Sequence, residues 1–278
     1  MGTVVGGIGI SHTPSMGLEF DKGMTGKFDP RWQKWFDGTR AVKTWLADLA
    51  PDAMVVVYND HLNHFDFSAY PTLAIGVADT FRQADEGWGL RPFPSLAGDT
   101  ELGLHVTNRL VRKGFDLTVC QDLAVDHGIY SWLPYLFDLP WCVPMVPIAV
   151  NMVRHPIPTS QRLHALGLAL REAIESFERD QRIVVISTGG MSHQISGARF
   201  GMANEALDLF FLEKLQNSVR ELIRIPQEEL MRLGGTEAAE LAIWFSMRGA
   251  LSNRIREMHR YYTFPAITGC GVIAFQEE

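Results

Sequence analysis

Four of the nine histidines follow short apolar segments, at points where buried strands are expected to end. His12 closes "GIGISH", His61 closes "VVVYNDH" and His193 closes "STGGMSH", while His127 follows the apolar segment 117–120. In open α/β sheets, ligands bind in the crevice outside the carboxyl ends of the strands. If these strands are parallel neighbours, the four imidazoles converge there. One such histidine alone is more often an ordinary loop residue, but four in one chain argue for a shared site.

A metal ion is the natural reason to gather histidines, because neutral imidazole is the commonest protein ligand of divalent first-row metals. No cysteine accompanies the set, which argues against a structural zinc site. A carboxylate would complete a site of two histidines and one carboxylate with open positions, the arrangement typical of non-haem Fe(II) oxygenases. Glu240 in "GTEAAELAIWFSMRGAL" is the candidate, since a carboxylate within an apolar helix needs a cation or a hydrogen-bond partner. The alternative is a partly exposed helical glutamate, and Glu237 fits a role at the helix N-terminus.

Strands and helices must position these side chains. Apolar runs predict strands at 4–10, 53–58, 117–120, 143–150, 183–187 and 271–275. Helical spacing and capping residues predict helices at 32–49, 99–113, 160–177, 204–223 and 236–247. Their alternation predicts an α/β fold with helices covering both faces of the sheet. Because there is no repeat and no obvious linker, we expect residues 1–278 to form a single domain. The longest irregular segment, 82–99, is rich in Gly and Pro, and a loop of that length is expected to be either functional or disordered.

The composition narrows the class of protein. Asp and Glu number 32 against 25 Lys and Arg, a net charge of −7, so no basic surface for nucleic acid is expected. The three cysteines are widely spaced and form no CxxC pair, which is typical of a reducing, cytoplasmic setting. The first apolar stretch lacks a basic segment before it and is interpreted as a strand, not a signal peptide. No run of 18 apolar residues predicts a transmembrane helix.

Six motifs, in this order along the chain, resemble those of the catalytic subunit of class III extradiol ring-cleavage dioxygenases: "SHTP", "YNDH", "ADEGWG", "VDHG", "TGGMSHQ" and "AELAIWFSMRGAL". The resemblance is closest to the β subunit of protocatechuate 4,5-dioxygenase and to gallate dioxygenase, and it runs to about Pro265. It implies an α/β three-layer sandwich, with a mixed, mostly parallel central sheet flanked by helices, as a single catalytic domain.

The resemblance also implies roles for individual residues. His12 and His61 correspond to the histidines that bind Fe(II), and Glu240 corresponds to the third ligand. His193 corresponds to the acid/base residue, and His127 to a catalytic histidine in the substrate pocket.

The substrate contacts follow from the same motifs. Thr13 in "SHTP" is similar to the gallate enzymes, whereas "GGMSHQ" is similar to the protocatechuate enzymes. Asn59 corresponds to an asparagine beside the iron. Thr268 in "FPAITGCGV" could hold a substrate carboxylate, although Ile267 departs from the small polar residues of the protocatechuate type.

The implied function is Fe(II)-dependent extradiol cleavage, with O2, of a catecholic aromatic acid, as in protocatechuate 4,5-dioxygenase. Three alternatives remain open: a gallate or 3-O-methylgallate dioxygenase, a 2-aminophenol-type dioxygenase, and an iron-free binding relative of the same fold. The joint presence of His12, His61, Glu240 and His193 argues against the last. The resemblance further implies a small α-type partner subunit in a hetero-oligomer, with a homodimer as the alternative.

Overall fold

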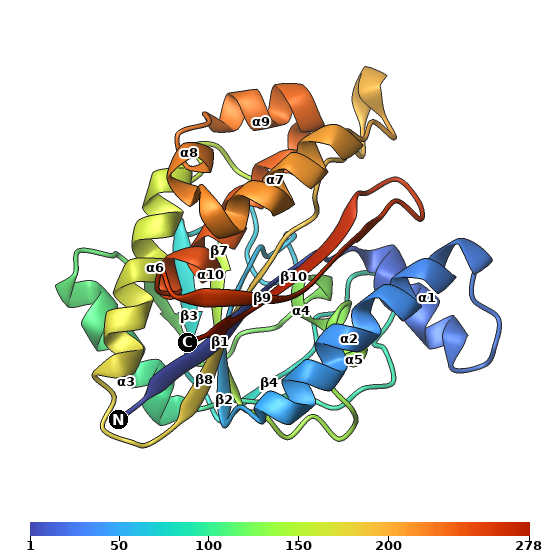
Figure 1. The fold of residues 1–278 in the computed structure, drawn as a ribbon. Coiled ribbons are helices and arrows are strands. Elements are labelled where there is room, and N and C mark those ends of the chain that lie inside the picture. Colours follow the sequence, from blue (N-terminus) through green and yellow to red (C-terminus); the bar gives the residue numbers. More distant parts are fainter.

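A mixed sheet of eight strands runs through the computed structural model, which describes residues 1–278 (Figure 1). The strands lie in the order β6-β3-β7-β2-β8-β1-β10-β9. Their bounds are β1 Thr3–Ile10, β2 Ala53–Tyr58, β3 Leu73–Gly76, β6 Thr118–Cys120, β7 Met145–Val150, β8 Arg182–Thr188, β9 Ile255–Thr263 and β10 Cys270–Glu277. A second sheet consists of β4 Thr80–Phe81 and β5 Leu96–Ala97.

The centre of the sheet is parallel. The parallel pairs are β7 with β2, β2 with β8, and β8 with β1. The carboxyl ends of these four strands therefore point in the same direction. β10 pairs antiparallel with β1, β9 with β10, and β3 with β7. The predicted mixed, mostly parallel sheet is therefore confirmed. Three of the histidine-bearing segments follow the adjacent strands β2, β8 and β1.

Helices cover both faces of this sheet, as predicted (Figure 1). Every residue of β2 is buried, and the strand alternates between two hydrophobic cores. Val55 and Val57 pack into the core that includes α6 (Ser160–Glu175) and α10 (Trp244–Ala250), whereas Val56 and Tyr58 pack into the core that includes α2 (Gln33–Leu49). A strand buried on both faces reads as a continuous apolar run, which is why the sequence predicts it well.

The helices connect the strands and carry part of the site. Their bounds are α1 Pro14–Gly23, α2 Gln33–Leu49, α3 Thr100–Arg112, α4 His127–Tyr130, α5 Leu133–Leu136, α6 Ser160–Glu175, α7 Glu205–Asn217, α8 Val219–Leu222, α9 Gln227–Gly234 and α10 Trp244–Ala250. Short 3₁₀ helices are η1 Pro30–Trp32, η2 Gly197–Arg199 and η3 Thr236–Ile243. No helix is long and apolar enough to cross a membrane.

Two predicted helices were wrong in detail. The helix expected over 204–223 is interrupted at Ser218, where φ is −139°, so α7 and α8 are separate. The helix expected over 236–247 begins as η3 and becomes α-helical only at Trp244. β3 and β9 were not predicted. β3 has only four residues, and β9 is an edge strand whose charged side chains weaken any apolar pattern.

Candidate active site

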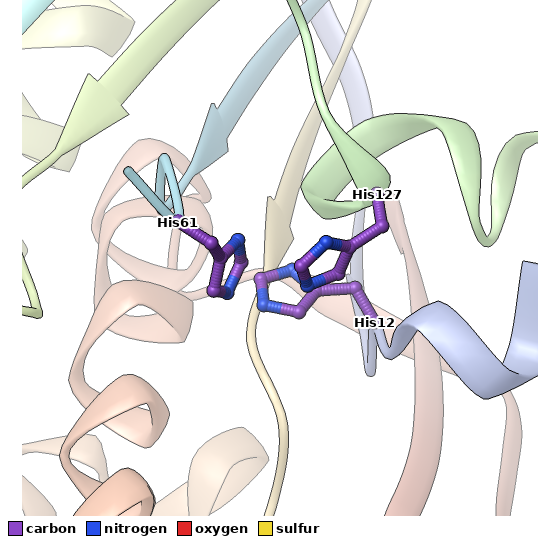
Figure 2. A group of neighbouring side chains, drawn as sticks. All are labelled: His12, His61 and His127. Atoms are coloured by element: carbon purple, nitrogen blue, oxygen red, sulfur yellow. The ribbon is translucent and has the colours of Figure 1, made fainter. Parts of the chain in front are cut away.

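His12, His61 and Glu240 meet beyond the carboxyl ends of the parallel strands. The Nε2 atom of His12 lies 3.3 Å from Oε2 of Glu240, and Nε2 of His61 lies 3.4 Å from Oε1. His127 joins them, with its ring centroid 3.9 Å from that of His61. Figure 2 shows the three imidazoles pointing toward a common space from separate segments. The three histidines form a group that could hold a metal ion.

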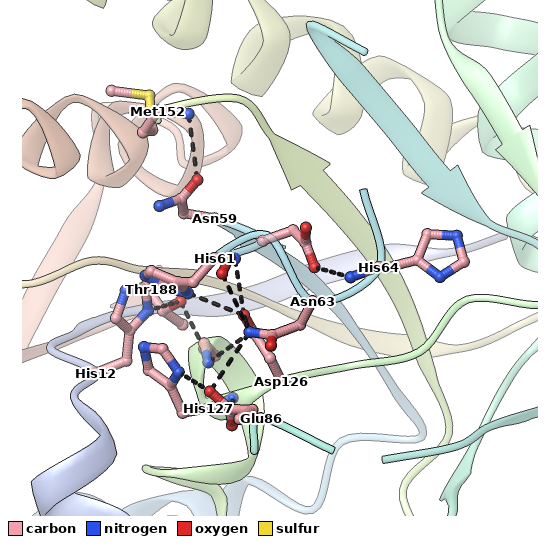
Figure 3. A network of polar contacts seen from close by, with 12 residues as sticks. His12, Asn59, His61, Asn63, His64, Glu86, Asp126, His127, Met152 and Thr188 are labelled. Carbon is pink, nitrogen blue, oxygen red and sulfur yellow. Dashed lines mark hydrogen bonds and ion pairs between the residues drawn. The ribbon is translucent and has the colours of Figure 1, made fainter. Parts of the chain in front are cut away.

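Hydrogen bonds to neighbouring residues fix which ring nitrogen of His12 and of His61 faces this space (Figure 3). Thr188 Oγ1 donates to the carbonyl of Gly128, so it accepts from Nδ1 of His12 at 2.8 Å. Nδ1 of His61 donates to Oδ2 of Asp126 at 3.0 Å. In the neutral imidazoles both Nε2 atoms therefore present lone pairs, and His12 Nε2 is buried without a hydrogen-bond partner. Partners of this kind are the usual support of metal-binding histidines.

The other two histidines are held in the same way. Nδ1 of His127 donates to Oε2 of Glu86 at 2.5 Å, and Oε1 of Glu86 accepts from the backbone N–H of His127. Nδ1 of His193 donates to the carbonyl of Met191 at 2.8 Å. In both imidazoles Nε2 is consequently free to accept a proton from a ligand.

Glu240 is also held by its surroundings. Asn59 Nδ2 donates to Oε1 at 3.1 Å, and the backbone N–H of Gly190 donates to Oε2 at 2.7 Å. The two glycines of "STGGMSH" permit this close approach. A Cβ at Gly189 would lie 2.7 Å from the carbonyl oxygen of Glu240, and one at Gly190 would lie 2.3 Å from the ring of His193. Both distances are too short for any side chain, so the turn requires glycine.

The charges around the cluster favour a cation. Burial opposes ionisation of Glu240, yet His12 and His61 outweigh it and hold the pKa of this carboxyl well below its ordinary value. Burial likewise opposes protonation of His61, but Asp126 and Glu240 outweigh it and raise its pKa well above its ordinary value. The ion-pair partners of Glu240 and Asp126 are histidines, not Lys or Arg. A divalent cation can take the place of the proton that the two carboxylates attract to His61. The two imidazoles and the carboxylate of Glu240 therefore fit a metal ion.

A pocket of about 500 Å³ opens over the cluster. Thr13, Thr268 and His193 line it together with the other three histidines and Glu240, and the further lining residues are Pro14, Ser15, Leu18, Ile195, Glu237 and Ile267. Asn59 is buried behind Glu240 and does not line the pocket. Of the eight site residues named from the sequence, seven therefore share one cavity.

The sequence reasoning missed the residues that orient the histidines. Asp126 and Glu86 stand inside the motifs "VDHG" and "ADEGWG", so the motifs were the available signal. Thr188 ends β8 and is the first residue of the motif "TGGMSHQ", which was its signal. Glu86 belongs to the long loop 82–99, which thus reaches the site.

Comparisons with known proteins assign the chain to a family of ring-opening dioxygenases. Residues 6–272 match the family described as the catalytic LigB subunit of aromatic ring-opening dioxygenase. Gallate dioxygenase of Pseudomonas putida is 37% identical over 195 residues, 69% of this chain and 57% of that protein. The 2,3-dihydroxyphenylpropionate/2,3-dihydroxicinnamic acid 1,2-dioxygenase of Klebsiella pneumoniae is 25% identical over 91% of this chain and 92% of its own length.

A solved structure shares the fold. The crystal structure of uncharacterized protein JW3007 from Escherichia coli K12 covers 99% of this chain, with a TM-score of 0.57 and 15% identity. Because the family match spans nearly the whole chain, this protein belongs to the family of catalytic LigB subunits of aromatic ring-opening dioxygenases.

Proposed function

We propose that this chain is an Fe(II)-dependent extradiol dioxygenase that opens the ring of a catecholic aromatic acid with O2, in aromatic compound degradation. His12, His61 and Glu240 would hold the iron. The observation that carries the proposal is that two Nε2 lone pairs and a buried carboxylate share one space, at the floor of a pocket. Bound there, Fe(II) would act as a Lewis acid on vicinal phenolic oxygens and supply electrons for the reduction of O2.

The protein's own groups handle the protons. His193 would act as the acid/base residue, because its Nδ1 is committed to Met191 and its Nε2 can take a phenolic proton and return it. Glu86 fixes His127 so that its Nε2 can accept a hydrogen bond from the substrate. Thr13 and Thr268, which both line the pocket, would orient the ring and its substituents. Asn59 would act on Glu240 and not on the substrate.

A protocatechuate-like acid is the first candidate substrate, from the "GGMSHQ" motif. Gallate is the second, and it is favoured by the 37% identity to gallate dioxygenase and by Thr13 in the pocket. 3-O-Methylgallate and 2-aminophenol remain alternatives to be tested beside them.

We further propose that residues 1–278 act as one catalytic domain and need a small α-type partner subunit. Leu18, Ile195 and Ile267 line the pocket mouth and are 39%, 55% and 38% exposed. No Lys or Arg lines the pocket, so a substrate carboxylate would gain from a cation at its mouth. A partner covering the mouth could supply this cation and exclude water. The alternative is a homodimer.

The three unpaired cysteines support a cytoplasmic location.

Anaerobic reconstitution with Fe(II), followed by O2 uptake, tests the activity. The panel contains protocatechuate, gallate, 3-O-methylgallate and 2-aminophenol, and the product is analysed by mass after reaction with ¹⁸O2. We expect uptake only with Fe(II) and gain of both oxygen atoms by a ring-opened product. Uptake that is the same without iron, or none with any substrate in the presence of the partner, would contradict the proposal.

The partner is tested by comparing kcat/KM of the chain alone with that of the chain co-expressed with its genomic neighbours. Weak activity that one small neighbouring protein restores is the expected result. Full activity and a low KM of the isolated chain would rule the partner out.

A further inference from the structure

A second pocket, of about 620 Å³, is lined by residues of α6, α8 and the end of α10. These helices lie near one another in Figure 1. Four arginines and one histidine line it, and no Asp or Glu does: Arg171, Arg220, Arg224, Arg248 and His164. We call these five residues the arginine pocket. None of them lines the catalytic pocket. In a chain of net charge −7, such a local excess of cations is unexpected from composition.

Two of the four arginines already have partners. Arg171 forms ion pairs with Glu175 at 2.8 Å and Glu277 at 2.7 Å. Arg248 is only 5% exposed and donates to backbone carbonyls, including Leu215 at 3.0 Å and Ser252 at 3.1 Å. Arg248 forms no ion pair, and the one carboxylate that influences its pKa, Glu277, is already paired with Arg171.

The side chains of Arg220 and Arg224 make no hydrogen bond and no ion pair within the chain. They stand four residues apart, on α8 and the turn that follows it, so they project from one side of this helical segment. Their guanidinium groups are exposed to solvent. They are therefore available to a ligand at no cost in broken contacts.

His164 shows that these cations face the same space. Burial lowers its pKa, and the charges of Arg248 and Arg220 lower it further. The imidazole makes no hydrogen bond within the chain, so its ring nitrogens are free to bond to a ligand. An anion in the pocket would offset the repulsion that the two arginines exert on it.

We propose that the arginine pocket binds a small organic anion with two or more carboxylate or phosphate groups. The guanidinium fork matches both kinds of oxyanion. A monoanion would bind only one of the two free arginines, Arg220 or Arg224. A polyanion can bind one of them with one acidic group and reach Arg171 and His164 on α6 with another. A volume of about 620 Å³ falls within the usual range of small-molecule sites.

Calorimetric titration at constant ionic strength tests this site with two probes, propane-1,2,3-tricarboxylate and fructose 1,6-bisphosphate, against acetate. We expect saturable binding of at least one polyanion and none of acetate. Binding of only one probe identifies carboxylate or phosphate as the preferred group. Absence of saturable binding by both probes would overturn the proposal.

The double variant Arg220→Ala/Arg224→Ala should weaken binding about tenfold or more, since it removes two charged hydrogen-bond donors. Its ring-cleavage activity without the anion should equal that of the wild type. The control Lys27→Ala/Lys34→Ala removes the same charge from exposed positions outside the pocket and should bind normally. Equal weakening by both double variants, or no weakening by the first, would show that the pocket is not the site.

Discussion

Nε2 of His12 lies 3.3 Å from Oε2 of Glu240 and has no hydrogen-bond partner, although it is buried. A buried nitrogen acceptor beside a carboxylate is costly unless a third group lies between them. Thr188 holds His12 from behind through Nδ1, and Gly190 and Asn59 hold Glu240. The two side chains are thus oriented toward a shared space by three contacts that leave His12 Nε2 free to bind a cation.

Asp126 should control metal affinity without being a ligand. It accepts hydrogen bonds from Nδ1 and from the backbone N–H of His61. Asp126→Asn should therefore lower Fe(II) affinity about 10- to 100-fold, the usual effect of losing such a partner. An anaerobic competition titration with a chelator measures this. Asp122→Asn, at an exposed carboxylate, is the control, and unchanged affinity in Asp126→Asn would contradict the assignment.

His193 should be needed for turnover and not for iron. His193→Ala should keep iron and bind substrate, but lose about 10²–10⁴-fold in kcat, the typical contribution of a general acid/base. His155→Ala, at an exposed histidine, is the matched control. Near-normal kcat in His193→Ala would transfer the role to His127.

Glu86 should act on turnover through His127, although it also accepts a longer hydrogen bond, of 3.4 Å, from Asn63. Glu86→Ala leaves both the Nδ1–H and the backbone N–H of His127 without their acceptor, so we expect kcat/KM to fall about tenfold or more. Glu86→Gln keeps one acceptor oxygen and should lose less. Iron content should be normal in both variants. Loss of iron from Glu86→Ala would instead favour a metal site that includes Glu86, Asp126 and His127, the second group able to hold a metal ion.

Asp208 should stabilise the turn that carries His193. This buried carboxylate accepts from the backbone N–H and the hydroxyl of Ser192, and from the hydroxyl of Tyr262. Asp208→Ala should lower the free energy of unfolding by about 1–3 kcal/mol for each buried donor left unpaired. It should also reduce kcat while iron is retained. Tyr262→Phe removes only one of the three bonds and should have the smaller effect in both urea unfolding and O2 uptake. Equal effects of the two variants would argue against this role.

The strands that carry the site were predictable because they are buried on both faces. β2 has the predicted bounds, β1 begins one residue earlier than predicted, and β8 is one residue longer at each end. His12, His61 and His193 accordingly follow adjacent parallel strands, as expected. His127 reaches the site differently, because β6 lies at the edge of the sheet and residues 121–126 cross back toward β2. Strand order decides this path, and a single sequence does not specify it.

The supporting contacts were less predictable. His61 and Asp126, or His127 and Glu86, are far apart along the chain, and their pairing depends on how the loops pack. Asn59 directly follows β2 and was predicted to contact the substrate. Its side chain donates to Glu240 of η3 and does not line the pocket, a contact between segments 181 residues apart that the sequence does not specify.

Anomalous diffraction at the iron absorption edge, from crystals grown anaerobically with Fe(II), tests the central claim most directly. The account predicts one iron per chain, coordinated by Nε2 of His12, Nε2 of His61 and the carboxylate of Glu240, with the pocket side open to substrate. An anomalous peak at Glu86, Asp126 and His127, or none near His12 and Glu240 in iron-loaded protein, would contradict it.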